Sequence, residues 1–411
     1  MLYQGDSAAL QTNCCIVGGG PAGMVLGFLL ARAGVHVLVL EKHADFLRDF
    51  RGDTIHPSTL QLMHELGLLK DFLKRPHQEL AQIGALIEDF AVTVADFSHL
   101  PTHCKFIALM PQWDFLNFIA ERAKRYPQFG LHMECTATDL LVENDRVVGV
   151  RTNGKNGPTE IRADLVVGAD GRHSIIRQKA GLHVMDLGAP IDVVWMRVSR
   201  QPDDPMQTLG RFRAGKILVT LDRDDYWQCA YVIPKNGFAA IQEKGLEVFR
   251  EELETVAPFL RGRTGEIRDW TDVKLLTVSV DRLHNWARPG LLCIGDSAHA
   301  MSPIGGVGIN LAIQDAVATA NILHSALLDR SPIDGTLHRV QKRREFPTKT
   351  TQAFQVFAHK NFIHPALSRK APLRRLPLPL KLLQRFPVLR RIPARLVGIG
   401  VRPEHVHNRM R

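Results

Sequence analysis

The amino-acid sequence predicts an α/β fold with α+β elements: a domain with a parallel sheet, an interleaved domain with a mainly antiparallel sheet, and a C-terminal helical tail. Three observations predict it. A strand–loop–helix–strand pattern lies near the N-terminus, the segment 188–280 is rich in strand patterns, and prolines divide a basic C-terminal segment into short pieces. The 411 residues, 45% of them apolar, allow two modules with packed cores.

The N-terminal pattern begins with the short apolar run 14–17, which enters the glycine-rich loop 18–23. A helical apolar pattern follows and stops at Gly34, a residue typical of helix C-termini. The run 35–40 then predicts a second buried strand, which closes with Glu41. These elements make a βαβ unit, whose two strands we expect to be parallel.

The loop of this unit carries G-x-G-x-x-G as Gly18, Gly20 and Gly23. The first glycine allows a sharp turn, the second allows backbone to approach a pyrophosphate, and the third allows close packing of helix on strand. The helix N-terminus offers free amides to phosphates, and Glu41 is placed to bind a ribose. The pattern predicts a dinucleotide site but does not separate FAD from NAD.

A later pattern favours FAD. The apolar run 291–294 enters Gly295-Asp296, which places a carboxylate where it can hold the hydroxyls of a ribityl chain. The glycines of 303–310 leave room for a flat ring against the backbone, and the following helix N-terminus can stabilise a reduced isoalloxazine. An N-cap followed by a tight turn is the alternative interpretation of this segment alone.

Composition excludes several classes of protein. None of the six cysteines has the spacing of a metal site or of a CxxC redox pair, so no metal is expected. No run of eighteen apolar residues and no secretory signal is visible, which predicts a cytoplasmic protein.

The positive charge is concentrated in the C-terminal tail. Residues 361–411 carry a net charge of +11, while the whole chain carries +10, so the rest of the chain is near neutral. No nucleic-acid partner is therefore expected. For this tail, one interpretation is helices packed on the body and the other is peripheral contact with an anionic membrane.

The three motifs together resemble the aromatic-hydroxylase group of single-component flavoprotein monooxygenases, the family of 4-hydroxybenzoate hydroxylase and the ubiquinone-pathway hydroxylases. GGGPAG stands at 18–23, GADGRHS at 168–174 and GDSAHAMSPIGGVGIN at 295–310. The resemblance implies a Rossmann-like FAD-binding domain and a substrate domain on the antiparallel sheet. We expect 13–80, 110–185 and 285–330 in the first domain, 81–109 and 186–284 in the second, and 331–411 in the helical tail.

The resemblance also implies roles for individual residues. Asp170 would serve both FAD and the nicotinamide nucleotide, and the catalytic residues would be Pro303, near the oxygen-reacting face of the flavin, and Arg51, near the pyrophosphate and flavin. The expected FAD-binding residues are Gly18, Gly20, Ala22, Gly23, Glu41, Lys42, Arg51, Gln112, Asp170, Asp296, Gly308, Ile309 and Asn310. Tyr226, Trp227 and Tyr231, on strands of the second sheet, are the candidates for the substrate pocket, although core packing explains any one of them as well.

The activity implied by the resemblance is hydroxylation of a lipophilic, aromatic, phenolic or polyketide-like substrate. NADH or NADPH would reduce FAD, O2 would add to give a flavin hydroperoxide, and one oxygen atom would pass to the substrate. The alternative is an FAD-dependent reductase, dehydrogenase or epoxidase of a lipid-like compound. Labelled oxygen in the product separates these two. A non-catalytic flavin-binding scaffold is a third hypothesis, and either a monomer or a homodimer is compatible with the sequence.

Overall fold

The computed structural model of the protein describes residues 10–47, 54–155, 157–205 and 209–407. Its larger sheet has eight strands, and its parallel centre runs in the order β20-β11-β1-β2-β8. Its strands are β1 (Leu10–Val17), β2 (Val37–Leu40), β8 (Phe129–His132), β9 (Thr136–Glu143), β10 (Arg146–Gly154), β11 (Gly157–Gly168), β19 (Ala287–Arg288) and β20 (Leu291–Cys293). The predicted parallel pair is therefore present, with Cys14 to Val17 opposite Val37 to Leu40.

Three helices build the core around this sheet: α1 (Pro21–Arg32), α4 (Gln112–Ala123) and α8 (Val307–Leu328). Helix α1 packs against both α4 and α8. The helical stretch Ile304–Leu328, most of which is α8, is long and apolar enough to cross a membrane, because its most apolar segment has a mean hydropathy of 1.2. However, 67% of that segment is buried inside the protein. Its apolar side chains belong to the main core, as expected of the central helix of a globular domain.

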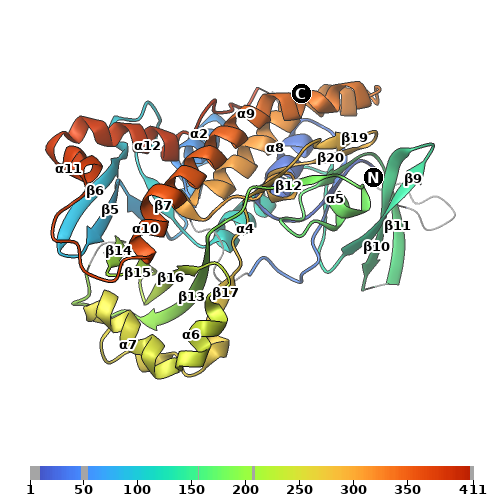
Figure 1. The fold of residues 1–411 in the computed structure, drawn as a ribbon. Coiled ribbons are helices and arrows are strands. Elements are labelled where there is room, and N and C mark those ends of the chain that lie inside the picture. The colour runs from blue at the N-terminus through green and yellow to red at the C-terminus, as the bar shows by residue number, and fades with distance from the viewer. Residues whose placement is uncertain (1–9, 48–53, 156, 206–208, 408–411) are drawn as a thin grey trace.

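The second sheet has seven strands in the order β17-β13-β16-β15-β14-β5-β6. These are β5 (Gln82–Ile87), β6 (Phe90–Asp96), β13 (Ile191–Ser199), β14 (Leu209–Arg213), β15 (Lys216–Asp222), β16 (Tyr226–Pro234) and β17 (Lys274–Leu276). All neighbouring pairs are antiparallel except β14 with β5, which joins two segments distant in sequence. The helices α6 (Phe238–Lys244) and α7 (Leu246–Val256), yellow in Figure 1, cover one face. The sequence predicts a single helix here, but Gly245 at φ 93° divides it.

Smaller elements connect the two sheets. They are β3 (Thr54–Ile55), β4 (Gln78–Leu80), β7 (Ile107–Leu109), β12 (Val184–Asp186), β18 (Asp281–Leu283), α2 (Pro57–Glu65), α3 (Leu69–Phe72), α5 (Ile175–Lys179), η1 (Phe97–His99), η2 (Pro258–Leu260), η3 (Thr264–Glu266), η4 (Trp270–Asp272), η5 (Gly295–Ser297) and η6 (Ile304–Gly306). β3, β7 and β4 form a three-stranded sheet, and β12 pairs with β18. The α/β fold with α+β elements is confirmed.

The C-terminal helices pack over the body, as the first interpretation of the tail predicts (Figure 1). They are α9 (Asp334–Ala358), the π-helix η7 (His359–Ile363), α10 (His364–Leu367), α11 (Leu378–Arg385), η8 (Pro387–Arg390) and α12 (Arg391–Gly398). Ala394 and Leu376 are buried, and Glu404 forms ion pairs with Arg343 and Arg344. We therefore regard this segment as an integral part of the fold rather than a removable extension.

Candidate FAD site

The loop between β1 and α1 has the tight geometry that its glycines predict. Gly18 has a φ of 110°, and a Cβ built on it would lie 2.3 Å from the carbonyl oxygen of Ala169. A Cβ on Gly23 would lie 2.0 Å from the carbonyl oxygen of Gly18, so a side chain fits at neither position. At Gly20 a Cβ would meet nothing within 4 Å. The loop is therefore closed on its protein side and open at Gly20, where a pyrophosphate could approach.

The three sequence motifs meet at the carboxyl ends of the parallel strands. The Ala169 amide donates to Val17 at 2.8 Å, and the Ile294 amide donates to Gly168 at 2.9 Å. A Cβ on Gly295 would lie 3.2 Å from the Cβ of Ala22, so the third motif also contacts the first. Ligands of open α/β sheets bind at this edge. The motifs thus converge on one place, as a shared nucleotide site requires.

Glu41 lies at the end of β2, directly beside the glycine loop. Its carboxylate accepts hydrogen bonds from the amides of Gly19 (3.1 Å) and His43 (3.0 Å) and is largely buried. This position suits a ribose-binding role. Lys42 is exposed, and Gln112, at the start of α4, is half-buried. Arg51 lies outside the described residues.

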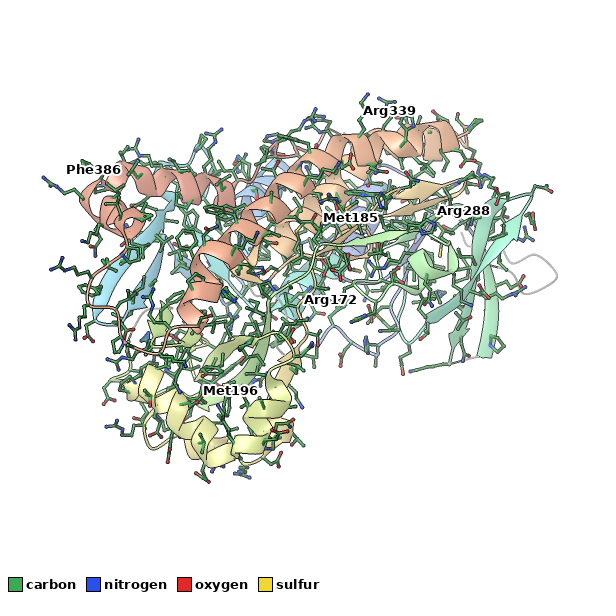
Figure 2. All side chains as sticks on the ribbon, in the orientation of Figure 1. Arg172, Met185, Met196, Arg288, Arg339 and Phe386 are labelled. Atoms are coloured by element: carbon green, nitrogen blue, oxygen red, sulfur yellow. The ribbon has the colours of Figure 1, made fainter. Side chains whose placement is uncertain are left out.

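Asp170 has a structural role that its sequence motif does not reveal. Its carboxylate accepts from the Ser174 hydroxyl at 2.5 Å and from the Ile176 amide at 3.2 Å, so it caps α5. Burial raises the pKa of Asp170, and these hydrogen bonds oppose that shift. Arg172, in the same motif, lies in the middle of the molecule (Figure 2) and reaches Asp296 at 3.5 Å. The second and third motifs are thus also joined by an ion pair, beside which ribityl hydroxyls could bind.

The 303–310 segment turns sharply before α8 begins. Gly305 and Gly306 both have positive φ, and a Cβ on Gly306 would lie 2.3 Å from Oγ1 of Thr54. The first-turn amides of a helix have no acceptors within that helix, so those of Gly308 and Ile309 are available for a flavin edge. Pro303 is half-buried at the start of this turn.

Asn310 differs from the expected role in one respect. Its Oδ1 accepts from the His56 amide (2.9 Å) and the Thr59 hydroxyl (2.7 Å), and its Nδ2 donates to the carbonyl oxygens of Thr54 (3.1 Å) and Gly306 (3.3 Å). The side chain is therefore fully used in tying 54–59 to the glycine turn. A contact with FAD would have to come from its backbone.

A buried charge network lies behind the third motif, and sequence reasoning missed it. His299 contacts Asp315 at 2.6 Å, Asp315 pairs with Arg344 at 3.0 Å, and Arg344 pairs with Glu404 at 3.1 Å. Burial raises the pKa of Asp315, but His299 and Arg344 outweigh it and lower the pKa overall. The Asp315 carboxylate also accepts from the Gly295 amide. His299 thus helps to orient this turn.

The structure contradicts the substrate-pocket prediction for two of the three aromatic residues. Trp227 is 0% exposed, packs edge-on against Phe259 and donates its indole N–H to Asp204 at 2.7 Å. Tyr231 lies in the same core under α7 and donates its hydroxyl to Glu252 at 2.8 Å. Successive side chains of a strand alternate between faces, and these two point to the α7 face. They stabilise the sheet instead of lining a pocket.

Tyr226 lies on the opposite face by the same alternation. It is half-buried, and the guanidinium of Arg197 lies 4.9 Å from its ring centroid. Its place in a substrate pocket stays a prediction. The same face carries Trp195 and Val219, half-buried side chains that pack with Ile363. The residue pattern within β16 does not indicate which of its two faces lies toward a substrate pocket.

The residues present fit FAD: a glycine turn open at Gly20, an acid at the end of β2 and, in the third motif, the Asp296 carboxylate and the first-turn amides of α8. The family model described as FAD binding domain matches residues 11–353. The chain therefore belongs to this FAD-binding family.

Comparison with known proteins gives the activity. The chain is 34% identical over 352 residues to 6-methylpretetramide 4-monooxygenase of Streptomyces rimosus, covering 84% of this chain and 83% of that protein. It is 27% identical over 323 residues to rifampicin monooxygenase of Streptomyces venezuelae, covering 73% and 61%. The protein is an FAD-dependent monooxygenase, an oxidoreductase for which NAD(P)H is the typical co-substrate.

Solved structures share the fold. PqsL of Pseudomonas aeruginosa superimposes with a TM-score of 0.73 at 20% identity, covering 87% of this chain and 98% of that one. The p-nitrophenol 4-monooxygenase PnpA of Pseudomonas putida gives 0.73 at 19%, covering 94% and 98%. The myxobacterial halogenase CndH gives 0.74 at 18%, covering 92% and 90%. Hydroxylases and halogenases therefore share this architecture.

Proposed function

We propose that the protein hydroxylates a lipophilic, aromatic, polyketide-like substrate with NADH or NADPH and O2. The observation that carries the proposal is the 34% identity to a relative named for monooxygenation of 6-methylpretetramide, over more than four-fifths of both chains. The balanced reaction is substrate–H + NAD(P)H + H⁺ + O2 → substrate–OH + NAD(P)⁺ + H2O. FAD, when bound, supplies this redox chemistry.

The protein's own groups would bind and orient FAD. Glu41 would hold the ribose, the open side of Gly20 would face the pyrophosphate, and Asp296 would hold the ribityl hydroxyls. The free amides at Gly308 and Ile309 would meet the flavin edge with the positive end of the α8 dipole. Pro303 remains the proposed catalytic residue at the reacting face, and Arg51 remains the proposed catalytic residue near the pyrophosphate and flavin. Asp170, Lys42 and Gln112 remain proposed contributors to nucleotide binding.

The substrate would lie between the 303–308 turn and the face of the second sheet that carries Trp195 and Val219. This face packs against α10 and η7, and η7 begins at His359, whose ring contacts Ser302 next to Pro303. Apolar walls here would keep water from the reacting atoms and hold the ring of the substrate in place. Tyr226 remains a candidate at the edge of the same face.

Labelled oxygen tests the proposal directly. Purified protein with FAD, NAD(P)H and ¹⁸O2 is incubated with aromatic polyketides, simple phenols and lipid-like quinones, and the products are analysed by mass spectrometry. We expect one ¹⁸O atom in a hydroxylated aromatic product. Substrate turnover without ¹⁸O would support the reductase or dehydrogenase alternative, whereas ¹⁸O in a three-membered ring would support the epoxidase.

We further propose that the cytoplasmic protein contacts anionic membranes through α11 and α12. Residues 361–411 carry twelve Lys or Arg and one acid. The outward side chains of these helices, which we name the basic apolar face, are Leu378, Leu382, Phe386, Val388, Ile392, Lys381, Arg385, Arg391 and Arg395. Leu378 is 68% exposed and Ile392 62%. Each surface cation contributes roughly 1 kcal/mol to binding an anionic bilayer.

Vesicle binding tests this surface without truncation, which would break the Arg344–Glu404 pair. We expect the parent to sediment with phosphatidylserine vesicles and not with phosphatidylcholine vesicles. Leu378→Ser with Ile392→Ser should lower binding several-fold, as exposed apolar contacts are lost. Val142→Ser, at a site on β9 that is 49% exposed and far from α11, is the control for loss of an exposed apolar side chain. Equal binding of the double variant and the parent would disprove the proposal.

A further inference from the structure

From Arg344 onward, the buried side of α9 and the start of η7 carry a run of polar side chains beside apolar ones such as Ala358. Arg344, Thr348, Gln352, Gln355 and His359 follow one another at helical spacing, and each is at most 2% exposed. A helix that packs on a body normally buries apolar side chains there. Buried polar groups must be hydrogen-bonded to avoid a large desolvation cost. The hydrogen-bond partners of these side chains therefore indicate which part of the protein they hold in place.

The partners of two of these residues bracket Pro303. Gln355 accepts from the Ser302 amide at 3.1 Å and donates to the carbonyl oxygens of Ser302 (2.8 Å) and Ile304 (3.2 Å). His359 Nε2 contacts the Ser302 hydroxyl at 2.9 Å, and that hydroxyl accepts from the Ile304 amide at 3.3 Å. The backbone polar groups on both sides of Pro303 are thus satisfied by one amide side chain and one hydroxyl.

Gln352 extends the same arrangement one turn earlier. Its Nε2 donates to the carbonyl oxygens of Asp281 (2.7 Å) and Ala300 (3.1 Å), and its Oε1 accepts from Arg282 at 3.1 Å. Ala300, Ser302 and Ile304, which lie within the third motif at or just before the flavin turn, are therefore hydrogen-bonded to side chains of α9.

The helix also reaches the substrate side. His359 opens the π-helix η7, and Ile363 at its end packs with Ala366 and Leu367 on the face of the second sheet that carries Trp195. π-Helical segments are rare and occur often at functional sites. One continuous helix thus joins the backbone around Pro303 to the proposed substrate wall.

We propose that Gln355 and His359 are positioning residues, which fix the backbone of 302–304 so that the Pro303 turn matches the flavin and the substrate wall. They act through that backbone and contact neither FAD nor the substrate. The inference rests on the proposed placement of FAD beside Pro303. Without these side chains the buried groups of Ser302 and Ile304 would lose their partners, and the turn would move to recover them.

The chain offers a matched control on the same helix. Gln341 accepts from the Trp286 amide at 3.0 Å and donates to the His284 carbonyl at 2.7 Å. Its chemistry is that of Gln355, but its target lies away from the flavin turn. Gln341→Leu and Gln355→Leu therefore remove the same kind of contact at two different places.

The experiment compares these variants with the parent in three measurements. They are the FAD dissociation constant, the visible absorbance and circular dichroism of bound FAD, and the share of NAD(P)H oxidation that ends as H2O2 (NAD(P)H + H⁺ + O2 → NAD(P)⁺ + H2O2). For Gln355→Leu we expect FAD affinity about tenfold weaker, the effect of about one orphaned buried partner, with an altered flavin spectrum and more H2O2. For Gln341→Leu we expect parental values of all three.

A second pair keeps the test decisive if Gln355→Leu does not fold. His359→Gln retains an amide able to reach the Ser302 hydroxyl, whereas His359→Leu does not, so only the first should approach parental flavin spectra and affinity. Parental values in a folded Gln355→Leu, or identical behaviour of the two His359 variants, would overturn the inference. If no aromatic compound is hydroxylated, the proposed function fails, but FAD affinity and spectra still decide the positioning role.

Discussion

The nucleotide cradle and the substrate sheet are built by different means. In the cradle, backbone contacts within short motifs decide the shape: Gly18 against Ala169, Gly23 against the Gly18 carbonyl, and Gly295 against Ala22. In the substrate sheet, the role of a side chain depends on which face of its strand it lies on, and on what packs against that face. The shape of the cradle is therefore set by residues close together in the sequence, whereas the covering of each sheet face is set by elements far apart in the sequence.

Substitution of two glycines should separate clash from ligand contact within the cradle. Gly23→Val places atoms on top of the Gly18 carbonyl, at a Cβ distance of 2.0 Å, so we expect loss of FAD binding together with loss of stable folding. Gly20→Ala meets no protein atom within 4 Å, so the apoprotein should unfold at the parental temperature while FAD affinity falls. Calorimetry measures the unfolding temperature, and FAD titration measures the affinity for FAD. Parental FAD affinity in Gly20→Ala would show that the pyrophosphate does not approach this residue.

Two tryptophans test the two faces of the substrate sheet. Trp227→Leu should lower the free energy of unfolding by about 3 kcal/mol, because it leaves a cavity and removes the indole hydrogen bond to Asp204, which keeps its ion pair with Arg263; KM for the substrate should be unchanged. Trp195→Leu, on the half-buried opposite face, should change KM with a smaller loss of stability. Denaturant unfolding and steady-state kinetics supply both values. A KM change confined to Trp227→Leu would reverse our assignment of the faces.

A pH effect is expected at the joint between the cradle and α12. The Nδ1–H group of His56 donates a hydrogen bond to the carbonyl oxygen of Val397 at 2.7 Å, and burial lowers the pKa of His56 to about 4. An unfolded histidine titrates near 6.5, so between these values the unfolded chain binds a proton that the folded chain does not. Stability should therefore fall as the pH drops from about 6.5 to 4.

His56→Asn keeps a hydrogen-bonding amide but does not titrate. The parent should lose about 2 kcal/mol of unfolding free energy relative to this variant between pH 7 and pH 5. Urea unfolding at both pH values measures the difference. A constant difference would mean that the folded and unfolded forms of His56 have the same pKa.

The smallest expected effect concerns the half-exposed acid of the third motif. Asp296→Ala removes the proposed ribityl acceptor and should weaken FAD binding by about tenfold, the value of roughly one charge-assisted hydrogen bond. Its ion pair with Arg172 is long, at 3.5 Å, so the fold should tolerate the change. Equilibrium dialysis of FAD checks this. Unchanged affinity would remove Asp296 from the site.

The sequence was sufficient for the cradle because glycine spacing, strand ends and a terminal acid are constraints that lie within a few residues of one another. It did not reveal that Trp227 and Tyr231 face α7, since alternation defines two faces without saying which is covered by a helix. The role of α9 was also hidden. Gln355 reaches Ser302 across 53 positions, and no local pattern marks a glutamine that bonds distant backbone. The hydrogen bonds of the Asn310 side chain to residues 54–59 were hidden for the same reason.

The central claim is that the three motifs hold one FAD, with its flavin ring between the 303–308 turn and the sheet face that carries Trp195. A crystal structure of the FAD-loaded protein measures this directly. We predict the pyrophosphate at Gly20, the ribityl chain at Asp296 and the flavin ring against the turn. A flavin ring remote from residues 303–308, or on the α7 side of the sheet, would contradict the account.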